Sequence, residues 1–329
     1  MIALFRQKSP GNVAVLLVFG LLLKLPLFLH PRWTTDPDSD GWLYTNMVKG
    51  LPPGNAALLA GCIAFVLLYV QALLMNHLVN EYRMTGRQTF LPGMAFMLLT
   101  SLVPEWSYLS APLLAGTLIV WAFHKLFELY NAQTVNTRIY NIGLLIGIAS
   151  FFYFPSIFFA ACMLLGFGIL RPFRLNEVLL LLLGITTPYY FWAAYLFLTD
   201  RFTWMTFVPQ LGIGTPRQQP SYWMLASIIL IGIPFLMGGF YIQTQLRKML
   251  IQARKNWSII LLFVLLAVFI PFINNHSSYT PWVLTAAPVA AFHACAFLYP
   301  GRKWVPGLLF FLMIVFIFLQ QYGPLFWKK

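Results

Sequence analysis

The sequence predicts an all-α membrane protein: a polytopic transmembrane helical bundle of about eleven spans, with its N-terminus in the cytoplasm. Of its 329 residues, 60% are apolar and only 9% are charged, whereas soluble domains carry roughly 25% charged residues. The apolar residues form successive runs close to the length that a helix needs to cross the hydrocarbon core of a bilayer. The basic residues gather in alternate connections between these runs, as is typical of multi-pass proteins.

The predicted spans follow one another with short connections along the whole chain. They are residues 12–30, 56–78, 88–104, 110–128, 139–154, 156–171, 177–199, 222–243, 257–274, 280–299 and 303–322. The short runs 139–154 and 156–171 form either two spans or a re-entrant pair. The longest hydrophilic segments, near 31–55 and 200–221, are too short for a soluble domain, so we expect one integral membrane domain over residues 1–329 with these two segments as outer loops.

The orientation follows from the distribution of Lys and Arg. With the N-terminus inside, fourteen of these residues fall on the inner side and six on the outer side, and Lys24 lies within a span. The reverse orientation would violate the positive-inside rule at nearly every connection. We therefore expect a multi-pass protein in the lipid bilayer of the bacterial inner (plasma) membrane. The net charge of +13 is explained in the same way, so no nucleic-acid partner is predicted.

Most of the acidic residues lie on the predicted outer side, and three of them fall within one hexapeptide after the first span. The outer acids are Asp36, Asp38, Asp40, Glu105 and Asp200. Carboxylates this close repel one another unless they are solvated, paired with cations or bound to a hard metal ion. The hexapeptide fits a solvated turn, because Asp, Pro, Ser and Gly are turn residues. It equally fits a catalytic carboxylate site, whereas a calcium loop of the EF-hand kind lacks its acid at position twelve, which is Met47.

Three short motifs resemble those of one superfamily. They are LPLF (25–28) leading into DPDSDGWLY (36–44), PEWSY (104–108), and NNHSSYTPW (274–282) followed by AAP (286–288). With the predicted topology, they resemble the polyprenyl-linked, multispanning glycosyltransferases of the GT-C type, which carry an essential acidic motif early in the first outer loop. That loop, residues 31–55, is shorter here than the family's usual loops, which are long enough for amphipathic helices.

The resemblance implies a glycosyltransferase that works at the outer membrane face with a polyprenyl-phosphate-linked sugar as donor. It fits either an active enzyme or an inactive relative that has kept only the fold. The implied catalytic residues are Asp36, Asp38, Asp40 and Glu105. The implied substrate-binding residues are Lys24, Arg201, His276 and Tyr279. A divalent metal, Mg²⁺ or Mn²⁺, would be held by Asp38, Asp40 and Glu105, and it would balance the phosphate charge.

Lys24 is a charged residue inside the first predicted span. A charge at the centre of a span costs about 2.5–3.5 kcal/mol on insertion scales. Lys24 lies only six residues before His30, so its ammonium could extend to the lipid headgroups or pair inside the protein. Contact with a lipid phosphate is the alternative.

Two other function classes fit the same sequence. A structural or assembly protein of an envelope complex, with envelope proteins as partners, would also have basic inner loops and aromatic spans. A transporter would normally place ionisable groups near the middle of the membrane, and the spans hold few beyond Lys24. We expect no metal site at His77, His124 or His293, because each histidine is taken as isolated, with no second ligand at i+3 or i+4.

Overall fold

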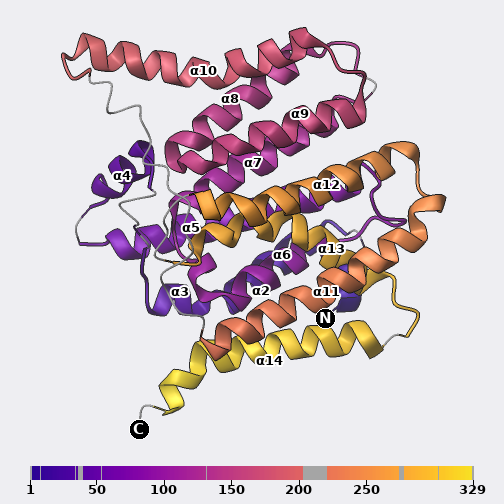
Figure 1. The fold of residues 1–329 in the computed structure, drawn as a ribbon. Coiled ribbons are helices and arrows are strands. Elements are labelled where there is room, and N and C mark those ends of the chain that lie inside the picture. The colour runs from indigo at the N-terminus through magenta and orange to yellow at the C-terminus, as the bar shows by residue number, and fades with distance from the viewer. Residues whose placement is uncertain are drawn as a thin grey trace.

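The computed structural model describes residues 2–7, 9–33, 35, 40–52, 54–130, 132–202, 221–273, 278–302 and 304–327, and the side chains up to residue 321. Its regular secondary structure is helical throughout these ranges, with two isolated β-bridges (Figure 1). The all-α prediction is confirmed. Lipid offers no hydrogen-bond partner to the backbone, so spanning segments must satisfy their own N–H and C=O groups, as helices do.

The helices appear in the following order. The α-helices are α1 (Ile2–Phe5), α2 (Gly11–Leu23), α3 (Leu25–Leu29), α4 (Trp42–Lys49), α5 (Ala56–Glu81), α6 (Leu91–Leu102), α7 (Ala111–Phe127), α8 (Asn136–Phe152), α9 (Phe159–Leu170), α10 (Leu175–Leu198), α11 (Tyr222–Gln245), α12 (Ile251–Phe269), α13 (Ala286–Leu298) and α14 (Trp304–Trp327). The 3₁₀ helices are η1 (Pro104–Ser107), η2 (Phe154–Phe158), η4 (Leu246–Lys248), η5 (Ile270–Ile273) and η6 (Thr280–Thr285).

A helix forms within every predicted span. Among the described residues, six helical segments are long and apolar enough to cross a membrane: 56–81, 175–198, 222–248, 251–273, 280–298 and 304–321. Shorter apolar helices cover 11–23, 91–102, 111–127 and 154–170. The protein is therefore a multi-pass membrane protein, and the count of eleven spans and the cytoplasmic N-terminus stay predictions.

The helix α6 lies at the centre of the bundle, and all twelve of its residues are buried. It packs against α2, α5, α13 and α14. At 1.5 Å per residue, twelve residues extend roughly 18 Å, which is less than the hydrocarbon thickness of about 30 Å. Pro104 begins η1 immediately afterwards, so the chain changes direction within the protein instead of continuing the helix. Trp106, Ser107 and Leu109, which follow this break, are buried within the bundle.

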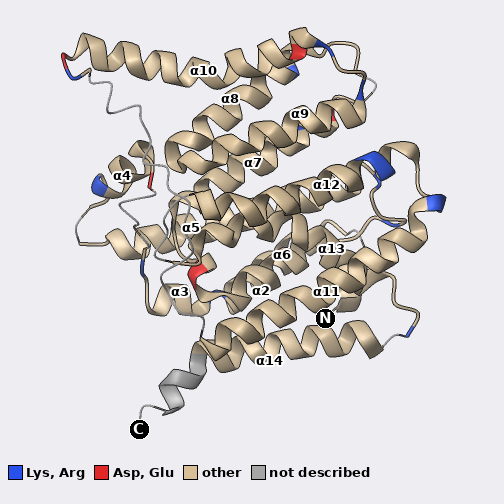
Figure 2. Cartoon of the chain, viewed as in Figure 1, with Lys and Arg blue, Asp and Glu red and all other residues tan. Residues whose placement is uncertain are grey.

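Figure 1 shows the long helices side by side along one common direction, with α10 along one edge and α14 along the opposite edge. Large apolar side chains such as Phe197, Leu236 and Phe240 are exposed on α10 and α11, as expected for a surface in contact with lipid. Lys and Arg are concentrated at the end of the bundle where α11 ends and α12 begins (Figure 2). This asymmetry agrees with the predicted inner face.

The first outer loop contains a helix despite its length. The eight residues of α4 bury Tyr44 and expose Trp42, so one side packs on the bundle and the other faces outward. The expectation that loop 31–55 is too short for an amphipathic helix is therefore wrong. An eight-residue helix extends only about 12 Å, and the loop has room for it.

Neighbouring helices approach closely at glycines, as is common in membrane bundles. A Cβ at Gly238 of α11 would lie 2.0 Å from the Phe292 carbonyl oxygen of α13, and one at Gly143 of α8 would lie 2.3 Å from the Leu181 oxygen of α10. Because backbone atoms occupy these positions, no side chain can be added without moving a helix.

We expect Gly238→Ala to destabilise the protein by about 1–3 kcal/mol, since α11 must move away from α13. The matched control is Gly239→Ala, where nothing lies within 4 Å of the added Cβ and helix propensity favours alanine by about 0.5–1 kcal/mol. Thermal unfolding of the detergent-solubilised protein checks both variants. An equal effect at the two positions would contradict the close approach.

Candidate functional site

The last two residues of the acidic hexapeptide, Asp40 and Gly41, are attached at the end of α8. Asp40 forms an antiparallel β-bridge with Tyr153, and the Gly41 N–H donates to the Phe152 carbonyl at 2.7 Å. A Cβ at Gly41 would lie 2.0 Å from the Phe151 oxygen, so only glycine permits this approach. Asp40 is half-buried, and its position is fixed by backbone contacts on both sides. Asp36 and Asp38 lie outside the described residues.

Tyr44 connects the first outer loop to the second. Its side chain is fully buried, and its hydroxyl donates to the Leu109 carbonyl at 3.1 Å. Burial, and secondarily the negative charge of Asp40, raise the pKa of the Tyr44 hydroxyl. The hydroxyl therefore keeps its proton and remains a donor. Trp33 forms a parallel bridge with the same Leu109, so two points of the first outer loop are attached to one residue.

Glu105 lies on η1 and contacts the late motif. Its Oε2 accepts a hydrogen bond from the Tyr279 backbone N–H at 3.1 Å. The indole N–H of Trp106 donates to the Tyr279 carbonyl at 3.0 Å. Both backbone groups of Tyr279 are therefore bonded to neighbouring residues of η1, although 174 positions separate Glu105 from Tyr279. His276, three residues after the end of η5, lies outside the described residues.

Lys24 is buried within the protein at the junction of α2 and α3, with 1% of its surface exposed. Its Nζ donates to the Ser107 hydroxyl at 2.7 Å, and that hydroxyl donates to the Thr100 carbonyl at 3.2 Å. Extension of the ammonium to the lipid headgroups is therefore wrong, and pairing inside the protein is what the structure has. No described carboxylate forms an ion pair with Lys24.

Residues 105–109 thus make direct contact with four separate parts of the chain. We call them the anchor segment. Lys24 and Tyr279 bond to this segment, which itself contains Glu105, and Tyr44 bonds to it four residues after Asp40. Arg201 lies just beyond α10 at the edge of the bundle, is exposed and forms no ion pair with a described carboxylate. Among the described residues, no side-chain contact links Arg201 to the anchor segment, so its substrate-binding role stays a prediction.

An apolar cavity of about 470 Å³ adjoins the anchor segment. It lies between η1, α11, α12 and the segment from Tyr279 into α13, and it is lined by Val103, Trp106, Met224, Ile228, Ile231, Gly232, Phe235, Val264, Val268, Phe272, Tyr279, Trp282, Thr285 and Val289. Two of these, Trp106 and Tyr279, are also the residues bonded to each other beside Glu105. The cavity therefore adjoins the residues that bond to each other beside Glu105, and it extends between helices. It was not visible in the sequence, because its walls come from four distant segments.

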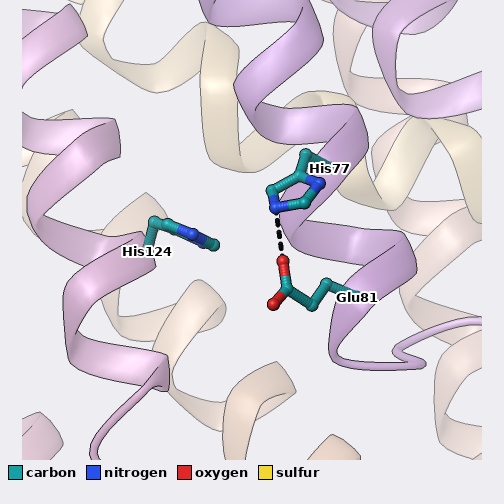
Figure 3. A group of neighbouring side chains, drawn as sticks. All are labelled: His77, Glu81 and His124. Atoms are coloured by element: carbon teal, nitrogen blue, oxygen red, sulfur yellow. Dashed lines mark ion pairs between the residues drawn. The ribbon is translucent and has the colours of Figure 1, made fainter.

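Sequence reasoning also missed a group at the other end of α5. His77 and Glu81 are four residues apart on one helix and form an ion pair, and His124 of α7 lies beside them (Figure 3). The expectation that His77 and His124 are isolated is wrong. The i,i+4 spacing of His77 and Glu81 was a usable signal, but the approach of α7 was not. His293 is buried, with Nε2 2.9 Å from the Ile231 carbonyl oxygen, and has a structural contact.

The sequence profile of a family of unknown function, DUF6427, matches residues 46–325. The chain belongs to this family. No curated protein matches it. Among solved structures, the crystal structure of ArnT from Cupriavidus metallidurans bound to undecaprenyl phosphate is similar, with a TM-score of 0.56 and 12% sequence identity.

The match to ArnT covers 94% of this chain and 64% of ArnT, so this DUF6427 protein spans about two thirds of the length of that structure. The resemblance to GT-C glycosyltransferases predicted from the motifs is confirmed at the level of the fold. At 12% identity the likeness shows the fold alone.

We expect Gly41→Ala to break the backbone contacts that hold residues 40 and 41 against the end of α8, because the methyl group cannot share space with the Phe151 carbonyl. Hydrogen exchange should then be faster at the amide of residue 41, which bonds Phe152, and at neighbouring amides. Gly54→Ala, in the same outer loop with nothing within 4 Å of its added Cβ, is the matched control. Unchanged hydrogen exchange in Gly41→Ala would contradict the close contact between Gly41 and the Phe151 carbonyl.

Proposed function

We propose that this DUF6427 protein is a GT-C-type glycosyltransferase of the inner membrane that takes a sugar from a polyprenyl-phosphate donor at the outer face. The observation that carries the proposal is the apolar cavity that starts at Trp106 and Tyr279, directly beside the Glu105 carboxylate, in a chain with a GT-C fold. Such a site can hold an apolar chain and a charged head at once.

The cavity suits the polyprenyl part of the donor. Its volume of about 470 Å³ falls within the usual range for ligand sites, roughly 300–1,000 Å³. Its walls are almost wholly apolar, and Met224, Ile228 and Phe235 of α11 form one of them. An isoprenoid chain bound to such walls is removed from water. Each Å² of apolar area removed from water favours binding by about 25 cal/mol.

The phosphate requires positive charge, and Lys24 supplies the candidate. Its ammonium is buried, bonded to a neutral hydroxyl and free of any ion pair with the described carboxylates. A buried charge is costly unless it is paired, so a phosphate near Ser107 would stabilise Lys24 as well as the leaving group. The Ser107 contact places this ammonium at the anchor segment, two residues from Glu105.

The proposed reaction is a single displacement at the anomeric carbon. The acceptor hydroxyl oxygen bonds to the anomeric carbon, the bond between that carbon and the phosphate oxygen breaks, and polyprenyl phosphate leaves with the electron pair. A carboxylate of Asp36, Asp38 or Asp40 takes the acceptor proton, as a general base does. Lys24 stabilises the negative charge that develops on the leaving phosphate.

The described residues test the predicted metal only in part. Asp40 and Glu105 are two of the three predicted ligands, and Glu105 Oε2 already accepts from the Tyr279 amide. A carboxylate has a second oxygen that can bind Mg²⁺ or Mn²⁺, so the pair is compatible with such an ion. Asp38, the third ligand, lies outside the described residues. The metal therefore stays a prediction, and the reaction above is derived without it.

We expect Asp40→Asn and Glu105→Gln to slow the formation of undecaprenyl phosphate from an undecaprenyl-phosphate-linked sugar by on the order of 100-fold. Binding of undecaprenyl phosphate itself should change little, because neither variant alters the cavity. Product formation in nanodiscs, followed by thin-layer chromatography, checks the rate. Asp200→Asn, an exposed acid beyond α10, is the control. Full activity in both site variants would sink the proposal in favour of an assembly role.

We expect Gly232→Phe to weaken binding of undecaprenyl phosphate about ten-fold or more, because the ring would occupy the cavity that Gly232 lines. Nothing lies within 4 Å of a Cβ at Gly232, so the first atoms of the side chain are accommodated. Gly239→Phe, with an equally open Cβ position on α11 outside the cavity, is the matched control. Native mass spectrometry in nanodiscs measures both. Equal binding by the two variants would place the lipid elsewhere.

A further inference from the structure

Two helices bring three metal-ligating side chains together at the end of the bundle opposite the anchor segment. His77 and Glu81 project from the last turns of α5, and His124 projects toward them from α7 (Figure 3). One ligand atom from each residue lies within 4.8 Å of the other two. The imidazole rings of His77 and His124 are 5.1 Å apart between centroids, so the three side chains surround one small volume.

These distances are close to those of a bound ion. Zinc binds imidazole nitrogen at about 2.0–2.1 Å and carboxylate oxygen at about 2.0–2.2 Å, which in a tetrahedron separates the ligand atoms by roughly 3.3 Å. No pair of these ligand atoms needs to approach by more than roughly 1.5 Å, and rotation of the exposed side chains of His77 and Glu81 supplies such adjustments. His77 and Glu81 are 60% and 45% exposed, whereas His124 is 15% exposed. One ligand is therefore fixed, and two are accessible and adjustable.

The second indication is the state of the His124 ring. Its Nδ1 is buried and has no hydrogen-bond partner among the described residues, although buried polar atoms nearly always have one. Its Nε2 lies 3.7 Å from Oε1 of Glu128. At that distance the two groups can attract each other electrostatically but do not form a hydrogen bond. Glu128 is itself balanced by Lys125 at 2.7 Å and by Arg138 at 3.7 Å, so it is not needed as a metal ligand.

We propose that His77, Glu81 and His124 bind one divalent transition-metal ion of the zinc type. Two imidazoles and one carboxylate are the protein ligands of many zinc sites that keep an open position, and imidazole also suits Fe²⁺, Co²⁺ and Ni²⁺. An ion pair alone would account for His77 and Glu81, since exposed i,i+4 pairs are common and weak. It would not account for the third side chain, which comes from a different helix.

The site opens to a polar cavity of about 560 Å³. His77 and Glu81 line it, together with Asn76, Asn80, Arg83 and Gln88. Asn80 and Arg83 also line an adjacent cavity with Lys248, on the basic turn between α11 and α12. Residue 77 lies roughly 30 Å along α5 from the start of the helix at Ala56, at 1.5 Å per residue. The metal site is therefore separate from the proposed transferase site, and an ion there would join α5 to α7 with an open coordination position facing water.

The experiment uses the full-length protein in detergent, stripped of metal with a chelator and then titrated with Zn²⁺ alone. We expect one Zn²⁺ per chain by mass spectrometry of the metal, and an affinity that falls by about 10- to 100-fold or more in His77→Gln, Glu81→Gln and His124→Gln. His30→Gln, an exposed histidine at the other end of the protein, should bind as the wild type does. Cobalt substitution adds a spectrum that reports nitrogen and oxygen ligands directly.

Three outcomes would overturn the proposal. The wild-type protein could bind no Zn²⁺, the variants of His77, Glu81 and His124 could bind Zn²⁺ with unchanged affinity, or His30→Gln could lose as much Zn²⁺ affinity as they do. Thermal unfolding of each variant without metal separates loss of a ligand from loss of the fold. His77→Gln and Glu81→Gln change exposed side chains, so the free energy of unfolding without metal should stay within about 0.5 kcal/mol of the wild-type value. Undecaprenyl phosphate binding by the same variants keeps this test distinct from that of the transferase site.

Discussion

The end of the bundle that holds the anchor segment depends on the break in the chain after α6. Because α6 ends at Leu102 inside the bundle, residues 105–109 are held where spanning helices would normally continue. Their polar groups bond to residues from other parts of the chain. Glu105 and Trp106 bond to Tyr279, Ser107 bonds to Lys24, and the Leu109 carbonyl bonds to Tyr44. Irregular backbone at membrane depth is tolerated only when it is buried in protein or lines a cavity, and here it does both.

The same constraint explains why charge and apolar volume meet at one place. Val103 and Trp106, at the break, both line the cavity. With the break, Trp106 and Tyr279 form the end wall of an apolar space between α11, α12 and α13. A carboxylate and an ammonium stand near that wall, attached to the anchor segment. This combination of apolar volume and charged groups is what an amphiphilic donor such as a prenyl phosphate requires.

The two ends of the bundle have different chemistry. The end that is predicted to lie outside has acids from the first and second loops and the buried Lys24. The opposite end has the basic connections and the imidazole–carboxylate group of α5 and α7. The helices between them expose large apolar side chains on α10 and α11 and bury polar side chains such as Gln71, which bonds Leu113 and Thr117. Gln71 is thus one of the buried polar residues that are bonded within the bundle.

Sequence by itself determined the helical class, the positions of the apolar helices and the grouping of acids after the first predicted span, because hydropathy, charge and turn residues are local properties. It also singled out Lys24, Glu105 and Tyr279 as residues of interest. It did not reveal that all three meet at residues 105–109, that α4 fits in a short loop, or that His124 lies beside His77 and Glu81. These depend on which helices are neighbours. Helix neighbours are set by close contacts such as Gly238 against Phe292, and such contacts join residues that are far apart in the chain and follow no local pattern.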